Sequence, residues 1–364
     1  MTTQPHFFAR REMRSQDIPV VNIADLIERD CTFANYERIG REICDACRSF
    51  GFFLVSFADA RAATADGSRE DRALVESLPR ALRALASTTD VSSTSNAELT
   101  FARCSSWFAR SSEDKARYAL SRGQGYQKLR LNVTQGRPDE HEALDFFRPI
   151  ASRTTQPEIG DDELVRLVNA RAKAMCRLGK VTMRAVACGL GLDIDAFEDD
   201  VAGCAFWILR LISSPGVSED EASRMADDDV KLSCGAHSDY GLLTFLEASA
   251  RGLQIKPSGG EAWIDVPHVP GTLVCNIGEM LSTLTNHEFR ATEHRVIRRK
   301  RDGAEPRISI AFFYETNYDT VIAPMDQRYP FHSLLATPGA KVYADFLEEK
   351  VSTNFAEPDA PRGG

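Results

Sequence analysis

The stretch Ala236-His237-Ser238-Asp239-Tyr240-Gly241-Leu242-Leu243-Thr244 decides the interpretation of this chain, because it places a histidine and an aspartate two positions apart beside an expected strand. In extended backbone such residues point to the same side, so the His237 imidazole and the Asp239 carboxylate face one point. A second histidine, His294, lies on a later expected strand. Two histidines and one carboxylate on one face of an octahedron leave three positions open, which is the ligand pattern of non-haem Fe(II).

Arg307-Ile308-Ser309, on the next expected strand, adds a second feature. Strand alternation puts Arg307 and Ser309 on one face, where the guanidinium offers a planar fork for a carboxylate and the hydroxyl offers a further hydrogen bond. An arginine that points inward among apolar neighbours needs a buried anion, and a bound dicarboxylate would supply one. The alternative for Arg307 is an ordinary surface salt bridge.

Short apolar or alternating runs follow one another from residue 205 onward, separated by Pro, Gly, Asn and Asp at intervals of roughly ten residues. This rhythm is typical of an antiparallel sandwich or jelly roll and not of βαβ units, so we expect an α+β fold. The organisation predicted for the chain has three parts. They are a helical N-terminal leader (1–200) with a polar insertion at about 58–98, packed on the core; a jelly-roll core (201–335); and a C-terminal helix with a disordered tail (336–364).

The composition of the chain excludes some classes of binding partner. The chain has 364 residues, 44 Lys and Arg against 53 Asp and Glu, and a net charge of −9, which argues against a nucleic acid or an anionic membrane as the main partner. It contains no apolar run long enough for a transmembrane helix, and its N-terminus lacks an apolar signal region. Nine cysteines, irregularly spaced, are typical of free thiols in a reducing compartment, so we expect a cytoplasmic protein. The Cys44-Asp45-Ala46-Cys47 motif lies in a helical pattern and is interpreted as buried thiols.

Several segments around the His237, Asp239 and His294 motif match a known family in sequence. The region from Gly235 to Tyr314 resembles the catalytic half of the Fe(II)/2-oxoglutarate-dependent dioxygenases of the isopenicillin N synthase-like superfamily. The matching segments, in the order and spacing of that family, are Ala236–Thr244, Gly252–Ile255, Trp263–Pro267, Pro270–Val274, Asn276–Leu281, Glu293–Val296 and Pro306–Tyr314.

This resemblance implies a double-stranded β-helix, a cupin-like jelly roll, with flanking helices. It also implies that His237, Asp239 and His294 hold Fe(II), and that Arg307 and Ser309 hold the distal carboxylate of the co-substrate 2-oxoglutarate. The activity implied is oxidation of a small organic molecule by O2, most simply hydroxylation, with release of succinate and CO2. The metal would supply the difficult chemistry, and the protein would supply orientation and a dry pocket.

One departure from the family concerns the co-substrate. Relatives often carry a tyrosine that contacts 2-oxoglutarate where this chain has Ser213-Ser214-Pro215, so Ser214 offers only a shorter hydroxyl. The candidate walls of the substrate pocket are aromatic, although each of them also fits a plain core position. They are Tyr126, Phe147, Trp207 and Phe313.

Other functions stay open at this point. A 2-oxo-acid-independent oxidase or cyclase of the same superfamily would use the same iron ligands. A jelly-roll module that binds a ligand without turnover would keep the fold alone. A zinc hydrolase is the weakest alternative, because the chain offers no helical general base for it. The substrate, the choice among hydroxylation, desaturation and cyclisation, and the oligomeric state are not determined by the sequence.

Overall fold

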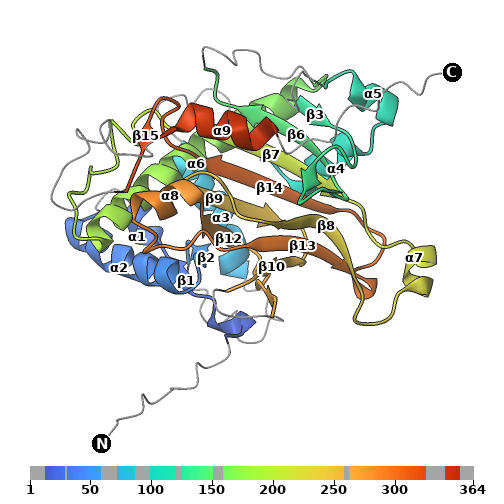
Figure 1. Ribbon diagram of the computed structural model, residues 1–364, viewed down its shortest axis with the longest axis horizontal. Helices are drawn as coiled ribbons and strands as arrows, with labels where there is room; N and C mark the ends of the chain where they lie inside the picture. The colour runs from blue at the N-terminus through green and yellow to red at the C-terminus, as the bar shows by residue number, and fades with distance from the viewer. Residues whose placement is uncertain are drawn as a thin grey trace, which may run out of the picture.

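The structure, a computed structural model, describes residues 13–28, 31–58, 72–86, 99–119, 125–150, 159–257, 262–324 and 341–352. Two β-sheets face each other, and helices cover the outer face of the larger one (Figure 1). The strands are β1 (Val20–Asn22), β2 (Phe52–Ser56), β3 (Gly125–Gln127), β4 (Val133–Thr134), β5 (Arg137–Pro138), β6 (Glu142–Phe147), β7 (Trp207–Ser214), β8 (Val230–His237), β9 (Leu243–Ala248), β10 (Leu253–Ile255), β11 (Ile264–Asp265), β12 (Leu273–Ile277), β13 (His294–Arg299), β14 (Arg307–Tyr314), β15 (Val321–Ile322) and β16 (Lys341–Val342).

The helices surround these sheets. They are α1 (Ala24–Ile27), α2 (Phe33–Ser49), α3 (Arg72–Ala86), α4 (Phe101–Phe108), α5 (Ser112–Ala116), α6 (Asp162–Gly189), α7 (Glu219–Arg224), α8 (Glu279–Leu284) and α9 (Tyr343–Ser352), with short 3-10 turns at Ser15–Asp17 and Lys300–Asp302. No helix in the described ranges is both long and apolar enough to cross a membrane.

The sheet order is that of a jelly roll. The larger sheet runs β1-β2-β12-β9-β14-β7-β6-β3, and the smaller runs β11-β10-β13-β8. Neighbouring strands come from distant parts of the chain: β14 lies between β7 and β9, and pairs antiparallel with both. The connections therefore pass between the sheets, as the rhythm of the sequence predicts.

The first 200 residues contribute strands to the larger sheet as well as helices. They contribute β1 and β2 at one edge of the larger sheet and β6 and β3 at the other, so this part completes the sheet that the later strands begin. Of the polar insertion expected at about 58–98, the structure describes residue 58 and α3, which contains Pro79. The rest of that insertion, and the tail after residue 352, lie outside the described residues.

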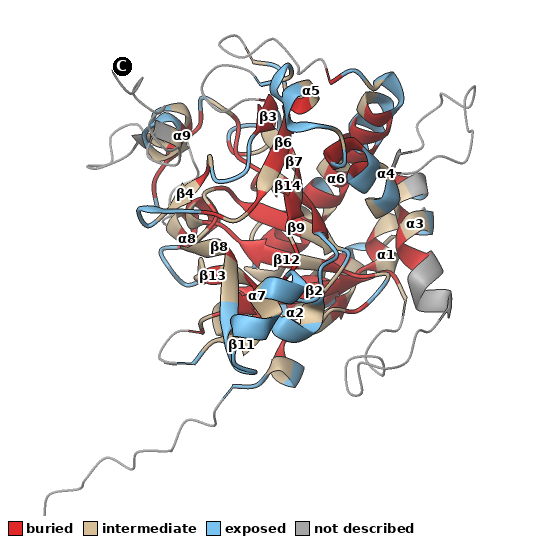
Figure 2. Ribbon diagram, turned by 90° about the vertical axis from the view of Figure 1, so that its right-hand side faces the viewer, coloured by how far each residue is buried: buried red, intermediate tan, exposed pale blue. Residues whose placement is uncertain are grey.

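The longest helix forms where leucine and methionine recur at threes and fours. In α6 the Asp161 side chain caps the N-terminus by accepting a hydrogen bond from the Leu164 amide. One stripe of the helix is buried, and α6 crosses α2 where two glycines, Gly40 and Gly189, meet without side chains between them. The strands in the middle of the molecule are correspondingly buried (Figure 2).

The apolar core has two parts. The larger cluster fills the space between the larger sheet and the helices, and includes Phe146, Phe245 and Phe312. A smaller cluster, with Phe52, Leu253 and other apolar side chains, fills one end of the space between the two sheets. The other end of that space holds polar and charged side chains instead, and the candidate site is there.

Candidate active site

The two histidines of the sequence motif meet across a strand pair. His237 ends β8, His294 begins β13, and the two are direct partners in the antiparallel ladder. Asp239 follows β8 and turns back toward them, so that its Oδ1 lies 3.7 Å from the Nε2 of each histidine. The ligand atoms of the three side chains all lie within 4.8 Å of one another. The structure therefore brings the predicted triad together.

Hydrogen bonds orient all three groups. The Nδ1 of His237 lies 2.9 Å from the Gly235 carbonyl, and that of His294 lies 3.2 Å from the Thr292 carbonyl. Since a carbonyl only accepts, each Nδ1 carries the hydrogen and each Nε2 keeps a lone pair for a metal. Asn276 on β12 donates its amide to Asp239 Oδ2 at 2.6 Å.

The charge states of His294 and Asp239 suit a divalent cation. At His237 burial acts to lower the pKa, but Cys234, Asp239 and the Gly235 carbonyl outweigh it and raise the pKa to about 10, so a metal would have to displace one proton from this imidazole. Burial, together with the neighbouring His237, lowers the pKa of His294 to about 4, so its imidazole is neutral. Burial works against ionisation of Asp239, but His294, His237 and Asn276 outweigh it and hold the pKa of this carboxyl below its ordinary value. Two imidazole lone pairs and one carboxylate, with space on one side, fit an iron that keeps open positions.

Arg307 lines a cavity of about 270 Å³ that is separate from a larger cavity beside the triad. It is buried, its Nε donates to the carbonyls of Ala250 and Arg251, and its Nη1 donates to the Ser309 hydroxyl. Burial and the nearby Arg298 lower its pKa to about 10, which leaves it charged at neutral pH. Within the described ranges no carboxylate lies within ion-pair distance of it. The guanidinium is thus a buried cation that lacks an anion, as a dicarboxylate-binding site requires.

Ser214, the expected substitute for the missing tyrosine, is the cross-strand partner of Arg307. The alternation of the two strands points both side chains to the interior face. The small serine therefore leaves room next to the guanidinium rather than filling it.

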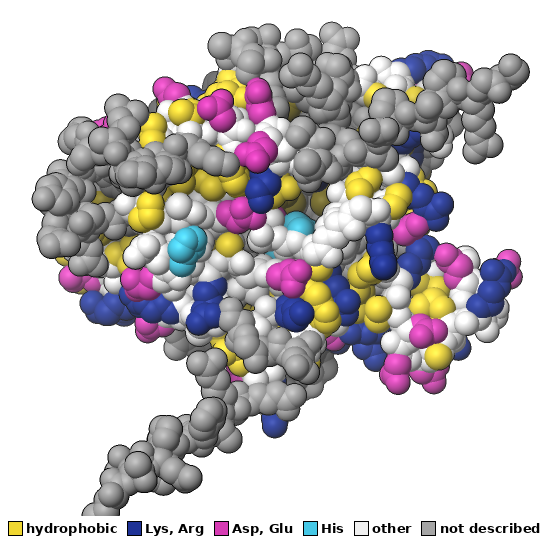
Figure 3. Space-filling model, in the orientation of Figure 1, with side chains coloured by type: hydrophobic (Ala, Val, Ile, Leu, Met, Phe, Trp, Pro, Cys, Tyr) yellow, Lys and Arg dark blue, Asp and Glu magenta, His cyan; other side chains and the backbone are white. Residues whose placement is uncertain are grey.

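A cavity of about 510 Å³ opens beside the triad. Figure 3 shows this face, where histidine surface lies in the middle with acidic and basic side chains around it. Lining residues come from the β4–β5 hairpin, from strands β7, β8 and β14, and from helices α8 and α9. Among them are Asp139, His141, Arg210, Cys234, Phe313 and Glu315.

The aromatic residues predicted as pocket walls divide between the two faces of the larger sheet. Phe313 lines the cavity. Phe147 is paired with the cavity-lining Ile208 but is itself core. Trp207 stacks on Phe312 on the helix-covered face, and Tyr126 packs on Trp107 and donates its hydroxyl to Glu142. Tyr126 and Trp207 thus face away from the cavity.

Comparison with known proteins agrees with this geometry. Residues 218–316 match the family model of the 2OG-Fe(II) oxygenase superfamily. The chain is 36% identical to homoarginine-6-hydroxylase 2-ODD-C23 of Glycine max, over 69% of this chain and 79% of the relative. It is 31% identical to homoarginine-6-hydroxylase 2-ODD-233 of Oryza sativa subsp. japonica, over 93% of this chain and 97% of the relative. This chain belongs to the 2OG-Fe(II) oxygenase superfamily.

Solved structures show the same fold. A full-length protein of Neurospora crassa, solved in complex with alpha-KG, covers 92% of this oxygenase with a TM-score of 0.67 at 21% identity, and 96% of that chain is matched. JOX2, solved with 2OG, Fe and JA, covers 93% of it with a TM-score of 0.62 at 20% identity, and 89% of that chain is matched. The predicted jelly-roll core is confirmed.

The enzyme class is confirmed as well. The oxygenase is an Fe(II)- and 2-oxoglutarate-dependent dioxygenase that oxidises a small organic molecule with release of succinate and CO2. Hydroxylation is the reaction for which the two relatives are named. Sequence reasoning did not single out Asn276, Asp139, His141 or Glu315. Local pattern gives no signal for them, because each reaches the site through a strand pairing or a hairpin closure between distant segments.

Proposed function

We propose that this oxygenase hydroxylates a small cationic amino acid of the homoarginine type. In this proposal His237, Asp239 and His294 hold Fe(II), and Arg307 with Ser309 holds the far carboxylate of 2-oxoglutarate. The observation that carries the assignment is the buried triad together with an anion-deficient guanidinium on the same inward face of β14 as the cavity-lining Phe313. Bound iron and co-substrate would together supply the oxidising power for C–H cleavage.

The roles of the protein groups follow from their contacts. The Gly235 and Thr292 carbonyls fix the histidine tautomers, and Asn276 fixes the carboxylate, so iron would meet a preorganised set of ligands. The Arg307 fork is held by two backbone carbonyls and Ser309, which leaves its remaining N–H groups for the co-substrate.

The substrate proposal is supported by relatives. Two of them, 36% and 31% identical to this chain, are named as homoarginine-6-hydroxylases. The cavity beside the triad is lined by Asp139, which has no cationic partner within 4.0 Å in the described ranges, and this suits a cationic substrate.

The experiment is an assay of the purified, Fe(II)-loaded protein with 2-oxoglutarate and a panel of amino acids: homoarginine, arginine, lysine, leucine and glutamate. We expect homoarginine to stimulate succinate formation and to yield a product heavier by one oxygen atom in mass spectrometry. Iron-loaded protein that forms no succinate with any member of the panel would remove the substrate proposal. A product formed equally well without 2-oxoglutarate would remove the proposed role of Arg307.

We also propose that the protein works in the cytoplasm. Eight of the nine cysteines, all except Cys31, are free thiols, and the exposed Cys204 is accessible to an oxidant. Free thiols persist in reducing compartments. Fractionation of the source cells, followed by immunoblotting, tests this location.

A further inference from the structure

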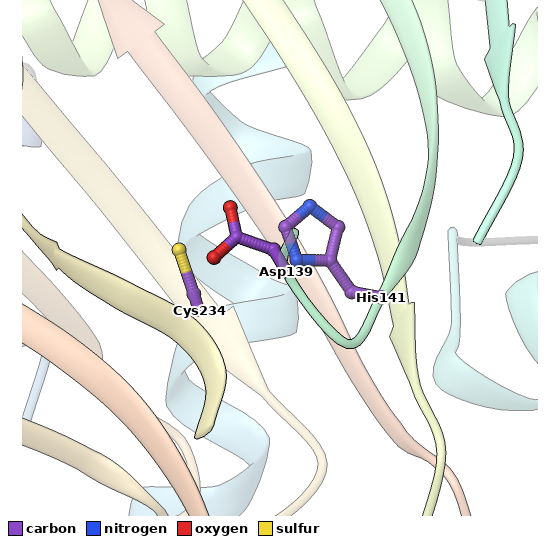
Figure 4. A group of neighbouring side chains, drawn as sticks. All are labelled: Asp139, His141 and Cys234. Atoms are coloured by element: carbon purple, nitrogen blue, oxygen red, sulfur yellow. The ribbon is translucent and has the colours of Figure 1, made fainter. Parts of the chain in front are cut away.

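Three side chains meet on the wall of the cavity, next to the triad. Asp139 and His141 lie in the short segment between β5 and β6, and Cys234 lies on β8 of the other sheet. Asp139, His141 and Cys234 each place one ligand-type atom within 4.8 Å of the others. Figure 4 shows the Asp139 carboxylate between the Cys234 sulfur and the His141 ring. We call Asp139 and His141 the acceptor pair.

The acceptor pair is held in place by backbone and hydroxyl groups. Asp139 Oδ1 accepts a hydrogen bond from the Gly235 amide at 2.8 Å, and its Oδ2 accepts one from the Thr134 hydroxyl at 2.7 Å. His141 Nδ1 lies 3.0 Å from the Ser233 carbonyl and therefore carries the hydrogen. These bonds tie the segment before β6 to β8, so the pair is rigid.

One atom of the pair lacks a partner. His141 is almost entirely buried, and its Nε2 has no hydrogen-bond partner among the described residues. Burial also lowers the pKa of this imidazole, which makes the ring neutral and its Nε2 an acceptor. Buried acceptors without a donor are rare in proteins, because desolvation without a hydrogen bond costs free energy. The missing donor is then expected from a ligand.

Some of the charged side chains around the cavity are paired with an opposite charge, and others are not. Glu279 is paired with Lys350 on α9, and Arg210 is paired with Asp145 through two hydrogen bonds. Asp139 and the buried Glu315 line the cavity too, yet neither has a cationic partner within 4.0 Å in the described part of the chain. Burial raises the pKa of Glu315 to about 8, so this acid is protonated at neutral pH. Asp139 is therefore the charged carboxylate of the cavity wall, outside the triad, for which the described residues offer no cation.

Glu315 is buried in a fixed position, where its raised pKa keeps the acid protonated at neutral pH. It accepts a hydrogen bond from the Tyr343 hydroxyl at 2.7 Å, and it lies against Gly241, where any side chain would collide with its Oε2. A glycine at this position permits the acid to reach the cavity.

We propose that the acceptor pair binds the guanidinium group of the substrate, with Asp139 supplying the charge and His141 Nε2 accepting one N–H. The inference rests on the proposed function and deepens it, because it names the residues that select a planar, N–H-rich cation. A guanidinium carries several N–H donors in one plane, which suits a carboxylate and an adjacent lone pair. A metal ion is the competing occupant of this cluster, and Zn²⁺ binding distinguishes the two.

The test compares two substrates that differ mainly in charge, homoarginine and its neutral urea analogue homocitrulline. Steady-state kinetics and anaerobic calorimetry with Fe(II)- and 2-oxoglutarate-loaded protein are measured for Asp139→Asn and His141→Leu. Glu140→Gln is the matched control, since Glu140 is the neighbouring carboxylate and is paired with Arg130. We expect Asp139→Asn to raise the KM for homoarginine about 10- to 100-fold and to raise the KM for homocitrulline far less. His141→Leu should raise the KM for homoarginine about 10-fold, and Glu140→Gln should leave both values as in the wild type.

Several outcomes would overturn the inference. Wild-type protein that accepts homocitrulline as efficiently as homoarginine is one, and an Asp139→Asn variant that behaves like Glu140→Gln is another. Zn²⁺ that binds the His237→Ala protein and is lost on a further His141→Leu change would assign the cluster to a metal instead. Homoarginine that binds in calorimetry through Asp139 without being hydroxylated would support the inference while removing the proposed function. Absence of both binding and turnover would remove both.

Discussion

His294 is the direct cross-strand partner of His237, and both imidazoles point their Nε2 at the same oxygen of Asp239, 3.7 Å from each. The separation of the two histidines is thus set by the β8–β13 ladder. Ladder hydrogen bonds hold such a separation more firmly than a loop would, and metal sites on strands are correspondingly well defined.

Asn276→Leu should weaken iron binding. Asn276 donates to Asp239 Oδ2 at 2.6 Å, and loss of a partner that orients a metal ligand lowers metal affinity about 10- to 100-fold. Titration of the metal-free protein with Fe(II) under anaerobic conditions measures the change. Gln254→Leu is the control, because Gln254 makes a similar amide bond to Asp265 at 2.8 Å, away from the triad. Equal iron affinities for the two variants would contradict the positioning role of Asn276.

Arg307→Lys should raise the KM for 2-oxoglutarate about 10- to 100-fold, because an ammonium keeps the charge but loses the planar fork. Arg307→Gln, which also loses the charge, should be more severe. Initial rates at varied 2-oxoglutarate concentration measure both. Arg299→Lys serves as the control, since Arg299 is paired with Asp265 on the outer part of the smaller sheet. If Arg307→Lys and Arg307→Gln kept the wild-type KM for 2-oxoglutarate, as the Arg299→Lys control should, Arg307 would not bind the co-substrate.

Glu315 should make the stability of the iron-free protein depend on pH. Burial raises the pKa of Glu315 from 4.5 to about 8, so the folded protein keeps a proton that the unfolded chain releases near pH 4.5. Its contribution to stability is complete below pH 4.5 and is lost as the pH rises to about 8. The loss amounts to a few kcal/mol, at about 1.4 kcal/mol per pKa unit. Urea unfolding with a chelator at about pH 5 and about pH 9, on either side of the raised pKa, should show a smaller loss in Glu315→Gln. Parallel losses in the two proteins would refute this assignment.

Gly40→Ala should destabilise the protein by about 2 kcal/mol, although alanine favours helices. A Cβ at this position would collide with the Ala185 carbonyl of α6, and backbone atoms cannot move aside. Thermal unfolding measures the change. The exposed Arg41→Ala on the same helix should have little effect, and a Gly40→Ala protein as stable as that control would show that the helices can separate at no cost.

The residue types of the chain already determined the reaction centre. His237, Asp239 and His294 could be assigned from strand alternation and ligand chemistry, and Arg307 with Ser309 followed from the same alternation one strand later. These inferences are local: they need only the side-chain period of a strand and the preferences of a metal or an anion. The spacing of the short strands predicted the jelly roll, whereas the dependence on 2-oxoglutarate followed from the resemblance of these segments to the dioxygenase family.

Only the tertiary structure decided what surrounds that centre. Trp207 and Tyr126 face the helices because strand register, which depends on the partner strand, determines the face of each residue, and a shift of one residue reverses it. Asp139 and His141 reach Cys234 because the segment before β6 closes onto β8 of the other sheet. Such pairings join residues far apart in the chain, and local periodicity does not encode them.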